Sequence, residues 1–356
     1  MQIKINLTKK VKECRLLLFD HKGNYHKYIK IEYGENNVDI DLSEFKFIRF
    51  KIDGKHTENL ILSPNIEKLS IQYNLKRKKF NVCLEALLPK QGKIKNVFFT
   101  DLKNLAYRSR ANKKVTFYFS PGFQNKDVHL IIFFDSQNIY DQRHVGFYTK
   151  KADPYGGWQI DVPINNSGKN FIVAGIENAD KYRTVELSPN DVNKKYLNVN
   201  EGERAELSAG HLDDLGNFIT EQILPYLKSY QIVDAAIAGA SMGGLAAHYL
   251  GLKYPDIFDY IFSLSTASGL YKDSLWKIIY QNMPPKAGQK YFFFQGEADP
   301  LEKELARFNK RVTKNIIKAG LNEDDLLYYF DPKLKHNEVS WRYAFNFAFD
   351  KFYNKK

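Results

Sequence analysis

The chain has 356 residues, a net charge of +12 and 44% hydrophobic residues, which is enough apolar material for one or two buried cores. This composition excludes a wholly disordered chain, and the sequence lacks any run of the ~20 apolar residues that a membrane helix needs. The two cysteines, Cys14 and Cys83, form neither a disulfide framework nor a metal-binding cluster with His or Asp, so we expect structural thiols, no metal or organic cofactor, and a cytoplasmic protein.

Short strands are predicted near the N-terminus. Four segments rich in β-branched and aromatic residues are separated by Gly and Asn turns: residues 11–19, 25–33, 38–42 and 45–52. Strands that recur about every ten residues with such turns are typical of a sandwich. We expect a small all-β, sandwich-like accessory domain over residues 1–88 and a linker over residues 89–113.

The net positive charge raises the question of a nucleic-acid partner. The densest basic run covers residues 76–79, Lys-Arg-Lys-Lys. We interpret it as an exposed turn between two strands, since charge runs are usually solvated and no nucleic-acid-binding motif accompanies it. The prediction is therefore of no nucleic-acid and no membrane partner.

From residue 114 on, apolar strands alternate with amphipathic helices. Nearly continuous apolar runs occur at residues 115–119, 128–134, 171–175, 235–238 and 291–294. Helical spacing of apolar residues covers residues 212–227, 301–319 and 340–353. This alternation predicts an α/β domain over residues 114–356, with a mostly parallel sheet flanked by helices. Active sites in such sheets lie at the carboxyl ends of the strands.

The strongest motif is Gly-Ala-Ser-Met-Gly at residues 239–243. It follows the apolar strand 235–238 and leads directly into a helical pattern, which is the strand–turn–helix context of a nucleophile elbow. The glycines leave room for Ser241 to occupy a strained turn with its hydroxyl exposed. The alternative, a glycine-rich turn with a structural serine, explains the context less well. We therefore predict an α/β-hydrolase fold with Ser241 as the nucleophile.

A serine hydroxyl needs a base to remove its proton, and in this fold the base follows the serine along the chain. Only His248 and His336 follow Ser241. His248 lies on the helix that leaves the elbow and cannot turn back, so we interpret it as a partly buried helical histidine. His336 lies in a loop after the apolar strand 326–330, which makes it the predicted base.

The acid that orients the base is expected after the strand 291–294, where the chain reads Gln-Gly-Glu-Ala-Asp-Pro. We favour Asp299 over Glu297, because an acid at the third residue after the glycine is usual in this fold. Asp299 precedes Pro300 and is also a natural helix N-cap. Asp331 is a third, less favoured candidate.

An oxyanion needs two preorganised donors. The backbone N–H of Met242, directly after the nucleophile, is the first. The second is expected from the loop after strand 128–134, where we favour Gln137 and keep Ser136 and Asn138 as alternatives.

Six sequence blocks, taken in order, resemble the putative esterase family of α/β-hydrolases, which includes esterase D (S-formylglutathione hydrolase), enterochelin esterases, feruloyl and acetyl-xylan esterases and mycolyltransferases. The blocks are residues 135–141, 157–161, 173–178 with Arg183 and 186–189, 238–245, 254–258 and 336–341. The resemblance extends over residues 114–353 and implies the same nucleophile and base, with the acid in the loop at residues 297–299.

Three features depart from this family. Asp-Ser-Gln stands at residues 135–137 where the family usually has Asp-Gly-Gln, and the position of the acid varies among family members. The N-terminal 88 residues are similar in placement only to the extra β-domain of the enterochelin-esterase branch.

We therefore expect a serine esterase that hydrolyses a small-molecule acyl, feruloyl or siderophore-like ester through an acyl-enzyme. Trp158, Arg183 and Glu186 either shape the mouth of the site or serve as core packing and a surface ion pair. An acyltransferase with the same triad and a non-catalytic carbohydrate- or protein-binding relic of the fold are the alternatives. The sequence leaves the oligomeric state open.

Overall fold

The computed structural model describes most of the 356 residues. The described segments are residues 2–20, 24–41, 43–45, 47–57, 60–61, 66–74, 79–87, 92–99, 113–140, 157–190, 192–199 and 205–354. The basic run at residues 76–78, most of the expected linker and the side chain of Cys83 lie outside this part.

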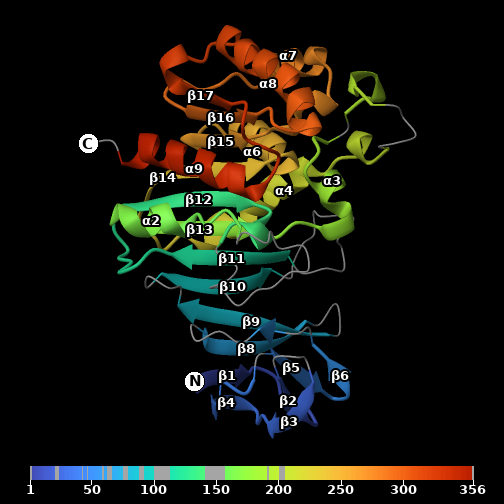
Figure 1. Ribbon diagram of the computed structural model, residues 1–356, viewed down its shortest axis with the longest axis vertical. Helices are drawn as coiled ribbons and strands as arrows, with labels where there is room; N and C mark the ends of the chain where they lie inside the picture. The colour runs from blue at the N-terminus through green and yellow to red at the C-terminus, as the bar shows by residue number, and fades with distance from the viewer. Residues whose placement is uncertain are drawn as a thin grey trace.

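One large sheet of 12 described strands runs through the molecule in the order β17-β16-β15-β14-β12-β13-β11-β10-β9-β8-β1-β4 (Figure 1). The strands from β12 to β17 are parallel neighbours, whereas β9, β10 and β11 pair antiparallel. The bounds are β1 Gln2–Leu7, β4 Gly34–Asp39, β8 Ile66–Asn74, β9 Lys79–Leu87, β10 Lys93–Phe99, β11 Lys113–Phe119, β12 Val128–Phe134, β13 Phe171–Ile176, β14 Ile232–Ala240, β15 Tyr260–Leu264, β16 Lys290–Gly296 and β17 Leu326–Asp331.

Helices cover both faces of the parallel part. On one face lie α4 (Leu212–Phe218), α6 (Met242–Lys253), α7 (Asp273–Asn282) and α8 (Pro300–Lys318). On the other lie α2 (Asp161–Ser167) and α9 (Glu338–Tyr353). Successive residues of β12 alternate between the two cores, Ile131 and Phe133 toward α9 and Leu130 and Ile132 toward α6. This double coverage explains the continuous apolar strands and confirms the predicted fold class.

The predicted helices are present with shifted ends. The expected helix at residues 212–227 is α4 followed by a π-helical turn, η6 (Ile219–Ile223), and α5 (Leu224–Tyr226). The remaining short elements are α3 (Arg183–Glu186), η2 (Ser136–Asn138), η3 (Asp180–Tyr182), η4 (Lys194–Tyr196), η5 (Ala205–Ser208), η7 (Ala267–Leu270) and η8 (Glu323–Asp325).

The N-terminal region is all-β, as predicted. A second sheet has the order β3-β2-β5-β6, with β7 paired to β5. These strands are β2 Cys14–Phe19, β3 Tyr25–Lys30, β5 Phe47–Ile52, β6 Lys55–His56 and β7 Leu60–Ile61. Buried residues of this sheet, such as Leu16 and Phe50, share a core with Ile3 and Ile5 of β1. The two sheets thus pack face to face as in a sandwich.

The segment expected to be a linker contains a strand. β10 pairs with β9 on one side and with β11 on the other, so the N-terminal strands and the parallel sheet belong to one hydrogen-bonded sheet. The strands β8 and β9 pair as far as Asn74 and Lys79, and the residues between these two, which include most of the basic run, lie outside the described residues.

Candidate active site

Ser241 lies in a strained turn between β14 and α6. Its backbone has φ 57° and ψ −120°, a conformation that non-glycine residues rarely adopt. The turn is held by a hydrogen bond of 2.9 Å from the Ser241 N–H to the Leu264 carbonyl at the end of β15. A Cβ on Gly239 would lie 2.5 Å from the Gly243 backbone, so the tight turn requires glycine there. The sequence motif therefore forms the expected elbow.

The N-terminus of α6 begins directly at this serine. The first intrahelical bond runs from the Leu245 N–H to the Ser241 carbonyl (3.0 Å), so the N–H groups of Met242, Gly243 and Gly244 have no partner within the helix. Such N–H groups, together with the helix dipole, favour negative charge. Met242 thus occupies the position expected of an oxyanion donor.

The predicted second oxyanion loop lies beside this helix end. It follows β12, a direct neighbour of β14, and forms the short helix η2 (Ser136–Asn138). A Cβ on Gly243 would lie only 3.0 Å from Asp135 Oδ2, which shows how closely the two segments approach. The Asn138 N–H donates to the Asp135 carbonyl (3.1 Å), so Asn138 is the least suitable of the three predicted donors.

His336 follows β17, two strands beyond β15 at the same edge of the sheet. Its Nδ1 atom forms a hydrogen bond of 2.9 Å with Glu302 Oε1, and its ring packs edge-on against Trp341 with centroids 5.1 Å apart. The imidazole side chain is 13% exposed. The ring is therefore oriented by a carboxylate and an aromatic wall, with one edge accessible.

The carboxylate on the imidazole is not the predicted one. Asp299 was expected to hold the ring, but its Oδ2 accepts a hydrogen bond from the His336 backbone N–H (2.6 Å), and its Oδ1 accepts one from the Glu302 N–H (3.0 Å) as the N-cap of α8. Partial burial alone would raise the pKa of the Asp299 carboxyl, but these backbone donors lower it below its usual range. A short aspartate that caps a helix and a loop at once cannot also reach the ring, which is the physical reason for the difference.

The other predicted acids are also placed elsewhere. The Glu297 N–H donates to the Leu334 carbonyl (3.1 Å), which ties the strand end to the histidine loop. Asp331 Oδ1 accepts a hydrogen bond from the Lys333 N–H (2.9 Å) in the turn after β17. Within the described hydrogen bonds, the carboxylate bonded to the His336 ring is that of Glu302.

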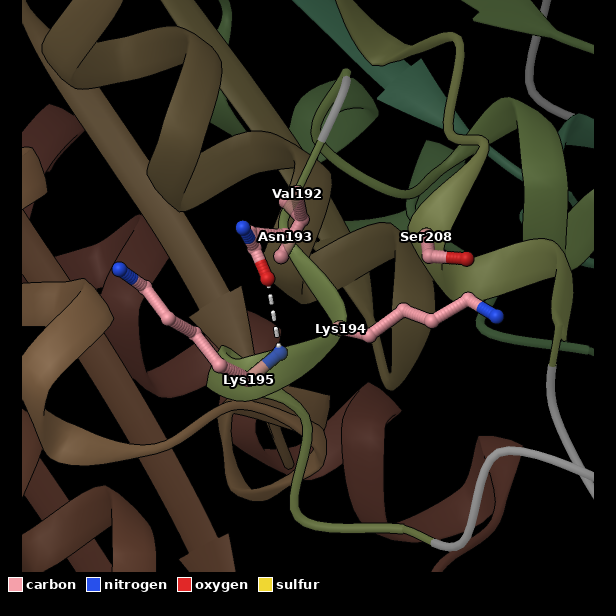
Figure 2. Close-up of a pocket in the computed structure, with 5 residues that line it drawn as sticks. All are labelled: Val192, Asn193, Lys194, Lys195 and Ser208. Atoms are coloured by element: carbon pink, nitrogen blue, oxygen red, sulfur yellow. Dashed lines mark hydrogen bonds between the residues drawn. The ribbon is translucent and has the colours of Figure 1, made fainter.

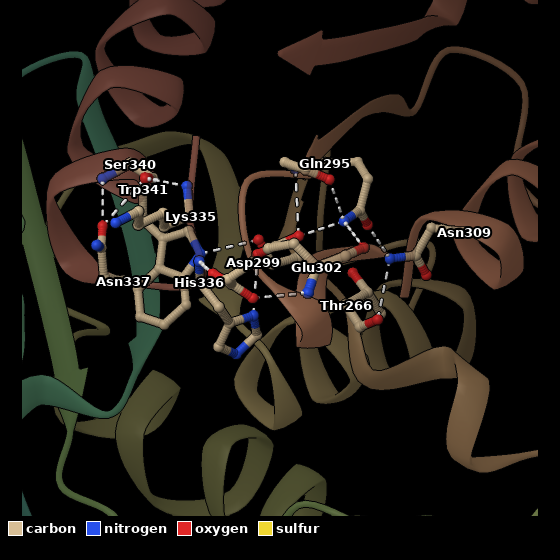
Figure 3. A network of polar contacts seen from close by, with 12 residues as sticks. Thr266, Gln295, Asp299, Glu302, Asn309, Lys335, His336, Asn337, Ser340 and Trp341 are labelled. Carbon is tan, nitrogen blue, oxygen red and sulfur yellow. Dashed lines mark hydrogen bonds and ion pairs between the residues drawn. The ribbon is translucent and has the colours of Figure 1, made fainter. Parts of the chain in front are cut away.

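Glu302 lies in the first turn of α8 and is fully buried. Its Oε2 accepts hydrogen bonds from the Gln295 side-chain amide and the Gly296 N–H. Asn309 in turn donates to Gln295 Oε1 (2.6 Å) and to the carbonyl of Thr266 (3.0 Å). Figure 3 shows this network, which continues from the helix to the histidine loop. These partners fix the orientation of the buried carboxylate.

Sequence reasoning missed Glu302 because its signal has a simpler interpretation. A glutamate three residues after an N-cap aspartate matches a capping box, whose glutamate normally returns to the backbone of the cap. In this structure the side chain instead points toward the preceding strand end and the imidazole. The available clue was its position in the first turn after a strand end, where a side chain can reach the carboxyl edge of the sheet.

A short chain of contacts links the nucleophile to the base. The residues after β15 lie between them: the Ala267 N–H donates to the Ser241 carbonyl (3.1 Å), and Ser265 Oγ accepts a hydrogen bond from the Trp341 indole N–H (3.0 Å). Trp341 in turn packs on the ring of His336. These contacts bring the ends of β14, β15, β16 and β17 into one site.

The three residues expected at the mouth of the site are held by protein contacts. Trp158 is 3% exposed and packs against Phe133, with ring centroids 4.9 Å apart, so it belongs to the core. Glu186 is buried and pairs with Lys113, while Arg183 pairs with Asp135. The Glu186 charge also favours the charged form of Arg183, so the predicted attraction between these two residues is accompanied by the pairs with Lys113 and Asp135.

A separate hollow of about 670 Å³ lies in the segment between β13 and α4. Figure 2 shows its lining residues: Val192, Asn193, Lys194, Lys195 and Ser208. The Asn198 N–H donates to the Leu270 carbonyl (3.0 Å), and Leu197 bridges to Tyr271. These bonds attach the segment to the chain that follows β15.

Comparison with known protein families identifies one match. The profile of the family described as putative esterase matches residues 109–346. The chain belongs to the putative esterase family. That membership supports ester hydrolysis as its class of reaction. No curated protein sequence matches the chain.

Several solved structures share the fold of this esterase-family chain. An IroE-like serine hydrolase from Shewanella oneidensis is 14% identical, with a TM-score of 0.54 over 73% of this chain and 81% of that one. The enterobactin esterase FES from Shigella flexneri in the presence of enterobactin is 12% identical, with a TM-score of 0.52 over 96% and 89% of the chains. For the same enzyme with 2,3-di-hydroxy-N-benzoyl-serine, the TM-score is 0.49 at 14% identity over 72% and 59% of the chains. At these identities the likeness concerns the fold alone. Among the described helices of this chain, we find none with the length and apolar character to span a membrane.

Proposed function

We propose that this protein hydrolyses a carboxylic ester with Ser241 as the nucleophile, His336 as the general base and Glu302 as the acid that orients the base. The observation that carries the proposal is the hydrogen bond between a fully buried carboxylate and the His336 ring, at the same sheet edge as a serine in a strained elbow. Asp299, the acid favoured by the sequence, becomes a positioning residue for the histidine loop.

The roles of the two nitrogen atoms follow from this bond. An ionised carboxylate only accepts hydrogen bonds, so Glu302 selects the tautomer in which Nδ1 carries the proton. That leaves Nε2 unprotonated, which is the form a general base requires. We infer that Nε2 faces the hydroxyl of Ser241.

In the proposed reaction, His336 Nε2 removes the hydroxyl proton of Ser241 while Oγ attacks the carbonyl carbon of the ester. The tetrahedral intermediate then breaks its bond to the alcohol, which leaves with the proton from His336. A water molecule, deprotonated by the same imidazole, attacks the acyl-enzyme and releases the acid and the free serine.

Negative charge develops on the carbonyl oxygen in both steps. We propose that the backbone N–H groups of Met242 and Gln137 stabilise it, the first from the helix end and the second from η2. Gln137 is the residue of η2 that we favour from the sequence.

We propose a small-molecule ester as substrate. The similar structures include an enterobactin esterase, siderophore hydrolases from Aspergillus nidulans and a ferulic acid esterase, which keeps siderophore-like and feruloyl esters first among the candidates. The hollow beside Lys194 and Lys195 is a suitable place for an anionic part of such a substrate.

The proposal is tested with Ser241→Ala on a panel of p-nitrophenyl and feruloyl esters. We expect kcat/KM to fall by on the order of 10³-fold or more, with an unchanged circular dichroism spectrum and loss of labelling by a fluorophosphonate. Ser167→Ala at the end of α2 is the control and should behave like the wild type. Full activity in Ser241→Ala would overturn the assignment, and ester formation with added alcohols in place of hydrolysis would favour the acyltransferase.

A further inference from the structure

The loop that carries the proposed oxyanion donor is anchored by one aspartate. Asp135 directly follows β12, and its backbone is left-handed, with φ 59° and ψ 47°. Its carboxylate accepts hydrogen bonds from Arg183 Nε (2.7 Å) and Nη2 (2.8 Å), one to each oxygen, and from Asn178 Nδ2 (2.7 Å). Both partners belong to the segment after β13, the neighbouring strand. The carboxylate thus ties the ends of two strands together.

A second charge pair holds the segment that carries Arg183. Lys113 at the start of β11 pairs with Glu186, and both side chains are fully buried. Arg183 begins and Glu186 ends the single turn of α3, so the position of the guanidinium is fixed through a buried contact. Although burial raises the pKa of the Asp135 carboxyl, its charged and polar neighbours, Arg183 foremost, lower it overall. The carboxylate therefore stays ionised and paired.

The other end of the same loop is joined to the histidine loop. Asn138 Nδ2 donates to Glu338 Oε1 (3.2 Å), and Glu338 comes two residues after His336. The Asn138 carbonyl accepts a hydrogen bond from the Trp158 N–H (2.8 Å). The short helix η2 is therefore held at both ends: by the contacts of Asp135, which precedes it, and by those of Asn138, its last residue.

We propose that the bidentate pair of Asp135 and Arg183 is a positioning device that sets the oxyanion hole by holding η2 against the N-terminus of α6. This inference rests on the proposed function. The Asp135 carboxylate itself packs against Gly243, one residue after the first oxyanion donor, so a shift of Asp135 moves one donor relative to the other. Donors must stay within about 0.5 Å of their productive geometry to stabilise the transition state.

The chemistry of arginine explains why this residue is used. A planar guanidinium presents two parallel N–H groups to a carboxylate, which fixes both distance and orientation, whereas an ammonium fixes only a distance. Arg183→Lys should therefore keep the charge and lose the orientation. Asp135→Asn should keep the shape and lose the charge-assisted bonds.

The test compares these variants with a change at a matched aspartate at the opposite edge of the same strands. Asp234 of β14 pairs with His129 of β12 (2.8 Å) and is 18% exposed, close to the 16% of Asp135. We expect kcat to fall 10- to 100-fold in Arg183→Lys and Asp135→Asn, with KM changed less than about threefold. Asp234→Asn should lower the melting temperature without lowering kcat.

Binding of a transition-state analogue separates positioning from loss of stability. An aryl trifluoromethyl ketone adds to the serine hydroxyl and places an oxyanion in the hole. Its inhibition constant should rise in proportion to the loss in kcat/KM for the Arg183 and Asp135 variants. Unchanged inhibition together with a reduced kcat would overturn the proposal, as would wild-type kcat in both variants.

Hydrogen–deuterium exchange gives a readout that does not depend on activity. The peptide spanning residues 133–140 should exchange faster in Arg183→Lys and Asp135→Asn than in the wild type and in Asp234→Asn. Equal exchange in all four proteins would overturn the anchor. If the variants exchange faster but the wild-type protein cleaves no ester, the proposed function is overturned and, with it, the catalytic role of the anchor.

Discussion

Glu302 divides its two oxygens between the imidazole of His336 and the end of β16. Because the side chain is fully buried, its hydrogen bonds are not weakened by competing water. These hydrogen bonds hold the Glu302 carboxylate in one orientation. In the proposed mechanism, that orientation determines which nitrogen of the His336 ring carries the proton. The residue therefore matters through its charge as well as through its length.

We predict that Glu302→Gln lowers kcat by about 10²- to 10⁴-fold, because an amide offers the Nδ1–H a weaker acceptor and can present an N–H in its place. Glu297→Gln, in the loop before α8, is the control, and its kcat should stay within about threefold of the wild-type value. Steady-state kinetics on one ester distinguishes the two. A larger loss of kcat in Glu297→Gln would mean that the acid that orients His336 lies in the loop at residues 297–299.

His248 illustrates the other fate of a histidine in this fold. Its ring is fully buried on α6, stacks on Trp276 with centroids 5.0 Å apart and contacts the Tyr280 hydroxyl through Nε2 (3.2 Å). It has the packed, helical position expected from the sequence and is more deeply buried than expected. Burial lowers the pKa of His248 from 6.5 to about 3, because the cation loses its hydration.

This shift predicts a specific pH dependence of stability. Between pH 6.5 and about 3 the unfolded chain binds a proton at His248 that the folded chain does not, so the free energy of unfolding falls as the pH drops. The slope from this one group is about 1.4 kcal/mol per pH unit well below 6.5. Urea unfolding at pH 7 and pH 5 should show a smaller loss in His248→Gln than in the wild type, by about 1–2 kcal/mol. His26→Gln on the exposed strand β3 should retain the wild-type loss, and equal losses in all three proteins would contradict the prediction.

At the scale of elements, the N-terminus of α8 and the loop after β17 are fixed by the same aspartate. Asp299 caps the helix with one oxygen and holds the His336 backbone with the other, while the Ala298 N–H donates to the Leu334 carbonyl (3.0 Å). The helix and the loop are therefore tied together, which fixes the position of the imidazole relative to the carboxyl edge of the sheet.

We predict that Asp299→Ala costs about 1–2 kcal/mol of stability through the lost cap and lowers kcat/KM by about tenfold through the loosened loop. Since the folded pKa of this carboxyl is depressed, the stability that it contributes is present above its ordinary pKa and is lost as the pH falls through the lower folded value. Asn322→Ala, which removes the cap of η8, is the control for capping alone. A loss in Asp299→Ala as large as that in Glu302→Gln would mean that Asp299 orients the ring after all.

The elements and the elbow could be predicted because their signals are local. The Gly-x-Ser-x-Gly turn, the apolar strand β14 before it and the spacing of apolar residues along α8 all lie within a few residues of the feature they determine. The partners of side chains could not be predicted in this way. Whether Glu302 turns toward the cap or toward His336, and whether Arg183 pairs with Glu186 or Asp135, depends on segments that are remote in the chain.

At the scale of the whole molecule, the sheet is continuous from the sandwich to the site. β10 hydrogen-bonds to β9 on one side and to β11 on the other, and Figure 1 shows these strands stacked between the N-terminal sandwich and the helices. The buried Asn96 of β10 also accepts a hydrogen bond from the Thr116 hydroxyl of β11 (2.6 Å). The Pro-Lys-Gln-Gly segment at residues 89–92 and the change of pattern near residue 114 suggested two domains with a linker, because a strand that pairs with both neighbours leaves no clear signal in its own sequence.

This continuity predicts cooperative unfolding. Scanning calorimetry of the full chain should show one transition, and Lys95→Pro should lower its midpoint by roughly 5 °C or more, because proline removes a ladder hydrogen bond from a strand paired on both sides. Lys27→Pro is the matched control in β3, which among the described strands pairs with β2 at the edge of the second sheet, and it should shift the midpoint less. Two separate transitions, with only the first displaced by Lys95→Pro, would mean that the sandwich and the catalytic sheet unfold independently. In that case β10 would be a boundary between the two parts. Its hydrogen bonds to β9 and β11 couple them only if the unfolding of either part leaves an exposed strand edge on the other.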